Sequence, residues 1–486
     1  MRRALLIIVV VLAGVVFGLW RALTPPSPLE AASTRFSLRN VTVIEPAMRR
    51  VPGVSLSVRD GRIVMDHGGM EGEAQGYGDL AGTYVLPGIV DMHAHLPPWT
   101  PLRLSGYFSF LFLAHGVTSI RDVGDTDGTS VDTARGAIEE GEFPGPRIFS
   151  CGPMVAGGEP IRWANTEIVE TPADAERIVA ALADAGHICV KSYEDLSLEK
   201  IVALKAAATK HGLQMLGHVP TLLAYEDALI PDVQHFFGVP PPDSLARDHV
   251  LDRAAEWTAV DEERLAEIVA VTLEHDIINT PTLVSTHQLL LLRDYEAALD
   301  DPSAGILPRL YAEVAWNPSD GMPIWKGIEQ YLERIEDAFE KKRALTGRLF
   351  EAGARLHLGS DAQQPFVVPG LSMHQEMGHF VDAGIPLEEV WALATWKAAE
   401  TLGQPYLGRL HPGGPADFLV FREDPTVDLA ALDTLEAVVA QGKLYTRADL
   451  DRARAAYQEH FRSTIVDLIS VPAARFTLRR TILRDY

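Results

Sequence analysis

Two histidines, His93 and His95, stand two residues apart in the first quarter of the chain. Side chains alternate along a β-strand, so both imidazoles would face the same side and could share one metal ion. The residues before them are mostly apolar and predict such a strand, which Pro97 and Pro98 would end just after the second histidine. A pair of this kind also fits an ordinary loop, so the rest of the chain has to decide between the two interpretations.

Four further residues that can bind a metal occur at the ends of predicted strands: Lys191, His218, His235 and Asp361. Each has an ordinary structural explanation, because a lysine can extend to solvent, a histidine can be hydrogen-bonded in a core, and an aspartate can cap a helix. Six such residues at the same ends of successive strands favour one common metal site over six separate explanations.

Eight short apolar segments alternate with helical or long connecting segments, which predicts an α/β protein with a (β/α)8 TIM-type barrel. The first predicted strand carries His93 and His95. The other seven are 117–123, 147–151, 188–193, 213–218, 232–236, 277–283 and 355–361. Barrels of this type carry their chemistry at the carboxyl ends of the strands. The six candidate residues all lie at those ends.

The segments on either side of the barrel predict further parts of the protein. We expect the barrel over residues 85–404, with a helical insertion at about 286–330, and a small β-sandwich domain built jointly from residues 34–84 and 405–447. Asp60-Gly61 is a typical hairpin turn within the first of these two segments. Residues 448–486 would form a C-terminal tail.

The N-terminal segment is apolar from Ala4 to Trp20, with two arginines before this run and Arg21 after it. The run just reaches the span of a bilayer core and has no clear cleavage site, so residues 1–33 predict an apolar helix that acts as a signal anchor, followed by a linker. The protein would then be membrane-anchored, with its catalytic domain extracytoplasmic, in the periplasm or outside the cell. The alternative is a signal peptide that is cleaved from a secreted protein.

Composition narrows the classes of partner and metal ligand. Lysine and arginine total 43 against 66 aspartates and glutamates, and the resulting charge of −23 argues against a nucleic-acid partner. The two cysteines, Cys151 and Cys189, are too few for a disulfide framework or a thiolate zinc site, and we expect them to be buried thiols. Any metal would therefore be held by nitrogen and oxygen ligands. The oligomeric state, a homo-oligomer included, stays open.

A set of motifs spread over about residues 34–445 resembles the amidohydrolase superfamily, in its imidazolonepropionase-like and prolidase-like branch with two metal ions. The motifs are Leu86-Pro-Gly-Ile-Val-Asp-Met-His-Ala-His95, His115-Gly-Val-Thr-Ser-Ile-Arg-Asp122, Val190-Lys-Ser-Tyr193, Gly217-His-Val219, Gln234-His235, Leu358-Gly-Ser-Asp-Ala362 and Gly413-Gly-Pro-Ala-Asp417. They are specific for the superfamily and much less so for a substrate.

The resemblance implies how the six residues would divide between two divalent metal ions. Lys191 would be N-carboxylated by CO2 and would bridge both ions, which fits a buried amine of lowered pKa. One ion would also take His93, His95 and Asp361, and the other His218 and His235. Zinc is the leading candidate for such a site, and manganese or cobalt would also fit.

By the same resemblance, the expected reaction is hydrolysis of an amide-type C–N bond in a dipeptide, an N-acyl amino acid or a cyclic amide. Asp361 would accept a proton from the attacking water and pass it to the leaving nitrogen. Two alternatives are a mononuclear deaminase of the same superfamily, which needs no carboxylated lysine, and a non-catalytic binding relative. The number of metal ions per chain, two, one or none, would separate the three.

Three residues are candidates for binding the substrate. Tyr193 lies two residues after Lys191 and so on the same face of its strand, where it could hydrogen-bond a substrate or pack at the rim of the barrel. Arg103 and Arg162 lie in the loops after the first and third predicted strands. A guanidinium there could pair with a carboxylate, although each arginine could equally be an ordinary surface residue. We therefore expect a small substrate with a free carboxylate.

Overall fold

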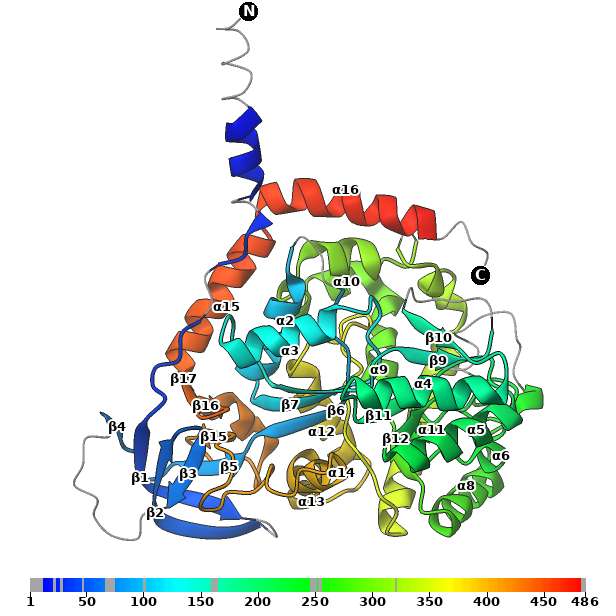
Figure 1. Ribbon diagram of the computed structural model, residues 1–486, viewed down its shortest axis with the longest axis horizontal. Helices are drawn as coiled ribbons and strands as arrows, with labels where there is room; N and C mark the ends of the chain where they lie inside the picture. The colour runs from blue at the N-terminus through cyan, green and yellow to red at the C-terminus, as the bar shows by residue number, and fades with distance from the viewer. Residues whose placement is uncertain are drawn as a thin grey trace, which may run out of the picture.

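The computed structural model of the chain combines a small sheet with a larger body of parallel strands and helices (Figure 1). The described residues are 12–20, 23–26, 29–45, 48–65, 75–98, 102–158, 165–244, 251, 256–319 and 321–481.

Strands from both ends of the chain form one eight-stranded sheet, in the order β17-β16-β15-β5-β1-β2-β3 with β4 beside β1. Their bounds are β1 Phe36–Glu45, β2 Arg49–Arg59, β3 Arg62–Met65, β4 Gln75–Asp79, β5 Tyr84–Pro87, β15 Phe418–Phe421, β16 Leu435–Ala440 and β17 Lys443–Thr446. Asp60 and Gly61, both with positive φ, form the two-residue turn between β2 and β3. The two chain ends therefore share a sheet, while the sandwich arrangement stays a prediction.

A second set of strands is mostly parallel and forms two sheets, β6-β7-β8 and β10-β9-β11-β12-β13-β14. Their bounds are β6 Ile89–Ala94, β7 Val117–Asp122, β8 Arg147–Ser150, β9 Met154–Ala156, β10 Thr166–Ile168, β11 Cys189–Ser192, β12 Gln214–Gly217, β13 Asp232–Gln234 and β14 Ile278–Thr280. The predicted strand at 355–361 makes only a short bridge, in which Asn279 N–H donates to the carbonyl of Arg355 at 3.2 Å. On its other side Met92 N–H donates to the carbonyl of Leu358 at 3.0 Å, so this segment lies between β14 and β6, consistent with the predicted barrel.

Helices connect these strands. Their bounds are α2 Leu104–Ala114, α3 Ser130–Glu140, α4 Pro172–Asp184, α5 Leu198–His211, α6 Tyr225–Ala228, α8 Glu262–Glu274, α11 Leu332–Glu351, α12 Leu371–Asp382, α13 Leu387–Ala392 and α14 Ala398–Thr401. Polar side chains fix several starts: Ser197 accepts from Lys200 N–H before α5, and Asp261 accepts from Arg264 N–H before α8. Gly212, in the left-handed region, ends α5.

The third predicted strand and the two cysteines differ from expectation. The chain breaks the strand after Ser150, so that β8 pairs with β7 and β9 pairs with β11. Cys151 lies at this break and forms a buried disulfide with Cys189 at the start of β11, with 4.4 Å between the two Cα atoms. The prediction of free thiols is wrong because folding brings residues 38 positions apart onto neighbouring strands. A closed loop of this length contributes about 4 kcal/mol by chain entropy.

The connection between β14 and α11 is long and consists of short helical pieces, as expected for the insertion. They are α9 Leu283–Gln288, α10 Tyr295–Leu299, a π-helical turn η5 at Leu310–Ala315, and 3-10 turns at Leu289–Asp294, Pro302–Gly305, Pro323–Trp325 and Ile328–Gln330. Further 3-10 turns lie at Pro242–Ser244 and Leu429–Thr434, and a π-helical turn lies at Leu393–Lys397. The tail forms α15 Arg447–Phe461 and α16 Thr464–Thr481, and α16 packs on η5.

Residues 12–20 form a helix that stands away from the body, near the start of α16 (Figure 1). Residues 1–11, which include the first eight residues of the predicted apolar run, lie outside the described part. Within the described part, no helix is long and apolar enough to cross a membrane.

Candidate metal centre

The first two candidate ligands come from the carboxyl end of β6 and point to one place. The Nε2 atoms of His93 and His95 lie 3.5 and 3.6 Å from Asp361 Oδ1. Gly359 makes this approach available, since a Cβ at that position would lie only 2.5 Å from the Cβ of His93. The glycine in the Leu358-Gly-Ser-Asp361 motif therefore lets the aspartate segment lie directly against β6.

Asp361 is held by its backbone as well as by its neighbours. Its φ of 57° is in the left-handed region, and its N–H donates to the carbonyl of His93 at 2.8 Å. The buried Asp91 fixes the same segment, because it accepts from Ser360 N–H at 3.0 Å and from Ser360 Oγ at 2.5 Å. Asp91 also accepts from His93 N–H, so one carboxylate ties the two sides of the site together.

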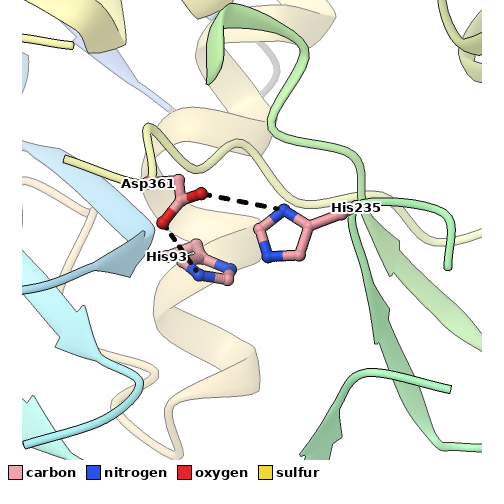
Figure 2. A group of neighbouring side chains, drawn as sticks. All are labelled: His93, His235 and Asp361. Carbon is pink, nitrogen blue, oxygen red and sulfur yellow. Dashed lines mark ion pairs between the residues drawn. The ribbon is translucent and has the colours of Figure 1, made fainter. Parts of the chain in front are cut away.

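His235 completes a tight group with His93 and Asp361, in which one ligand atom from each lies within 4.8 Å of the others (Figure 2). His235 follows β13, and its Nδ1 lies 4.0 Å from Asp361 Oδ2. The ring of His218, which follows β12, lies 5.2 Å from the ring of His235. Both His93 and His235 are buried, and burial holds the pKa of each well below its usual value. Both rings are therefore neutral, and each has a nitrogen lone pair that can bind a metal.

Each of the four histidines has an oxygen partner at its Nδ1 atom. The partners are Gln234 Oε1 for His93 at 2.5 Å, Gly124 O for His95 at 3.2 Å, Glu194 Oε1 for His218 at 2.9 Å and Thr282 Oγ1 for His235 at 2.6 Å. In the first three pairs the oxygen can only accept, so Nδ1 carries the hydrogen and the Nε2 lone pair is free to bind a metal; the Thr282 hydroxyl can either donate or accept. The sequence motifs include Gln234 only as the residue before His235, without a role for it, and they do not include Glu194 or Thr282.

Gln234 is itself fixed by a buried ion pair beneath the site. Its Nε2 donates to Asp232 Oδ1 at 2.5 Å, while Arg121 Nη2 donates to Asp232 Oδ2 at 2.7 Å. Burial alone would raise the pKa of Asp232, but the adjacent Arg121 holds it below its usual value. The carboxylate is therefore charged and keeps the amide of Gln234 turned with its oxygen toward His93.

Lys191 lies in β11 with its side chain 1% exposed, and no ion pair of this lysine occurs among the described residues. Burial lowers its pKa strongly, and only the Coulombic attraction of Asp361 and other acids opposes this. Its charge also lowers the pKa of His93, His95 and His235, which places the amine within electrostatic reach of the group. The structure thus groups His93, His235 and Asp361, with His95 and His218 beside them and Lys191 within electrostatic reach.

The three predicted substrate residues have different surroundings. The ring of Tyr193 lies 4.7 Å from the ring of His218, beside the metal group. Arg103 is exposed at the start of α2 and forms no ion pair with another described residue. Arg162 falls within residues 159–164, outside the described part of the chain. Only the tyrosine is therefore placed next to the candidate ligands.

The insertion between β14 and α11 contacts the loop that carries Asp361. Trp316 donates from Nε1 to the carbonyl of Gln363 at 3.2 Å, and its ring lies 5.1 Å from that of Phe366. Gln363 is two residues after Asp361, so a tryptophan of the insertion packs directly on the aspartate loop.

The donor set suits a divalent metal ion. It offers imidazole nitrogens and carboxylate oxygen without sulfur, the combination that zinc, manganese and cobalt accept. His93, His235 and Asp361 already form a group that could hold one such ion.

Comparisons with known proteins identify the family of the chain and structures of similar fold. A family model described as "Amidohydrolase family" matches residues 84–445. Among solved structures, "AH, Bottromycin amidohydrolase" is 23% identical with a TM-score of 0.68, covering 91% of this chain and 92% of that one. A Xaa-Pro dipeptidase with bound methionine is 18% identical (TM-score 0.62, covering 85% and 100%), and a putative prolidase from Bifidobacterium longum is 23% identical (TM-score 0.61, covering 88% and 100%). These likenesses show a shared fold, and none of the curated proteins compared with the chain matches it.

Proposed function

Because the chain belongs to the amidohydrolase family, we propose that it is a metal-dependent hydrolase with two divalent ions, which cleaves an amide-type C–N bond in a small molecule. The observation that carries the proposal is the buried amine of Lys191, which forms no ion pair with another described residue and lies near four histidines and one carboxylate. A charged ammonium there would repel both ions, whereas the carbamate formed from a neutral amine and CO2, with loss of one proton, attracts them.

When bound, the ions polarise the substrate carbonyl and make water a stronger nucleophile at neutral pH. Asp361 is placed to transfer the proton because it lies among the candidate metal ligands. Its Oδ1 faces His93 and His95, and its Oδ2 faces His235. It takes the proton from water as the new C–O bond forms and gives it to the nitrogen as the C–N bond breaks. Amide and water thus become a carboxylic acid and an amine.

The substrate class that we propose is a dipeptide or N-acyl amino acid. Support comes from the resemblance in fold to proteins titled as a Xaa-Pro dipeptidase and a putative prolidase. The test is hydrolysis of a panel of dipeptides, N-acyl amino acids and cyclic amides by the purified protein, with metal counted per chain. We expect two ions and loss of turnover on chelation. One ion with release of ammonia would point to the mononuclear deaminase, and no ion with no turnover to a binding relative.

We further propose that the N-terminal segment tethers the protein to a membrane, with the catalytic domain in an extracytoplasmic compartment. Two observations support this: the apolar side chains of residues 12–20 are exposed, Phe17 by 62%, and the Cys151–Cys189 disulfide is of a kind that persists in oxidising compartments. Protease added to cells with a permeabilised outer envelope should digest the catalytic domain of the full-length protein. Recovery of intact, reduced protein in the cytosolic fraction would contradict the proposal.

A further inference from the structure

The outer side of α16 is apolar. Ile465 and Leu468 are 56% and 70% exposed, and Pro472, Ala473 and Phe476 are exposed as well. At 3.6 residues per turn these five positions fall on one side of the helix, over a length of about 16 Å. The solvent side of a helix in a globular protein is usually polar. This apolar strip of α16 is therefore the kind of surface that marks an interaction site.

The opposite side of α16 is attached to the body. Val466 is fully buried, and Asp467 Oδ2 lies 3.2 Å from Nη1 of Arg309, in the insertion. Just before the helix, Arg462 donates from Nη1 to the carbonyl of Ala304 at 3.2 Å. These contacts fix which side of α16 faces the body, so the apolar strip faces outward.

A second apolar segment lies on the same side of the molecule. The helix of residues 12–20 projects from the side of the body along which α16 lies, close to the start of α16 (Figure 1). Its Val16 and Trp20 are exposed, and in the sequence residues 4–11 directly before it are all apolar. Two segments from opposite ends of the chain thus present apolar side chains on one side. A partner that covers both has to be extended and apolar, as a lipid surface is.

The charge at the end of the chain favours the same partner. Residues 475–484 contain four arginines and no acidic residue, in a chain whose net charge is −23. Arg475 is exposed, directly beside the apolar strip. Helices that lie in a membrane surface combine an apolar side with basic residues, which attract anionic lipid headgroups.

We propose that α16 lies flat on a membrane that contains anionic lipids, with Ile465 and Leu468 at the boundary of the acyl chains and Arg475 at the phosphates. The inference rests on the tether in the proposed function and adds a contact at the other end of the chain. It also orients the enzyme, because α16 packs on η5 and Trp316, directly after η5, binds the loop after Asp361. The insertion that contacts the aspartate loop then lies on the membrane side.

The test measures the depth of a label on the full-length protein. Both cysteines of the chain are in the disulfide, so Leu468→Cys provides a single thiol for a nitroxide label. Leu273→Cys is the matched control, because Leu273 is 46% exposed on α8, away from α16 (Figure 1). On vesicles of phosphatidylcholine and phosphatidylglycerol, we expect the label at 468 to lose most of its collisions with a water-soluble nickel complex and to keep those with oxygen. The label at 273 should keep both.

The outcomes separate this contact from the tether. If the protein floats with the vesicles while both labels stay open to nickel, the tether stands and the contact of α16 is refuted. If the label at 468 is shielded and a high-salt wash then releases the protein, α16 binds lipid and the tether is refuted.

Three further results would overturn the proposal. They are absence of binding to the vesicles, equal shielding at 273, which would show unoriented adsorption, and shielding at 468 without vesicles together with a dimer in analytical ultracentrifugation. The last result would show that a second copy of the chain covers the apolar strip.

Discussion

Asp361→Asn is expected to lower kcat by about 10²–10⁴-fold while changing KM much less, because a positioned general base typically contributes that factor to the chemical step. The substitution suits the backbone, since asparagine tolerates the left-handed φ of 57° at this position. The bond from the residue's N–H to the carbonyl of His93 does not involve the side chain and should survive. An amide oxygen can still face the metal group, but it cannot accept and return a proton.

The measurement is steady-state kinetics at saturating metal, with the metal content of each sample determined. Asp417→Asn is a suitable control, because Asp417 is also buried and hydrogen-bonded, to Arg147 at 2.9 Å and to Gln441 N–H at 2.8 Å, but belongs to the small sheet. It should keep kcat even if it loses stability. Full activity in Asp361→Asn, together with inactivity in Asp417→Asn or Asp122→Asn, would show that the base had been assigned to the wrong carboxylate.

The sequence predicts that the candidate ligands lie close together because two simple rules apply to them. Strand periodicity places His93 and His95 on one face, and the parallel barrel collects strand ends at one rim. Both rules depend only on local pattern. The residues that orient the ligands follow no such rule: Gln234 and Thr282 act because of which strand or helix lies next to theirs, and this depends on the assembled barrel.

The predictions that failed or stayed open concern side chains whose position depends on irregular parts of the chain. The disulfide depends on the break after Ser150, which turns Cys151 toward the start of β11, and a run of apolar letters does not show such a break. Arg103 follows the first barrel strand, as expected, but a loop residue has no fixed direction, and its side chain faces solvent. Lys342 shows the converse, because a lysine in a charged amphipathic helix is expected at the surface and here it is buried.

The disulfide also bears on the metal group. Cys189 and Lys191 lie on the same side of β11 by strand alternation, with Cys151 covalently fixing the start of that strand. β8 and β11 have no ladder of their own, since β11 pairs with β9 and β12. The covalent bond therefore joins the two parallel sheets at a place where hydrogen bonds between strands are few, two residues from the proposed bridging ligand.

Lys191→Ala is expected to release at least one of the two metal ions and to remove most of the activity. The bridging charge would be lost, and alanine leaves a space in a fully buried strand position. The loss in metal affinity should exceed the roughly 10–100-fold that follows from changing an outer partner of a metal ligand. Short carboxylates such as acetate or propionate, added at millimolar concentration, should partly restore turnover by supplying two oxygens in place of the carbamate.

Metal content by mass spectrometry and turnover with and without added carboxylate test this expectation in the same samples. Lys205→Ala provides a matched control, because Lys205 is a partly buried lysine on α5 that donates to the carbonyl of Leu229 at 2.8 Å, away from the metal group. It should keep both ions, full turnover and no response to carboxylates. If Lys191→Ala instead binds two ions per chain and turns over at the normal rate without an added carboxylate, Lys191 does not bridge the metals. Asp361, whose two oxygens face histidines on opposite sides, would then be the remaining side chain placed to do so.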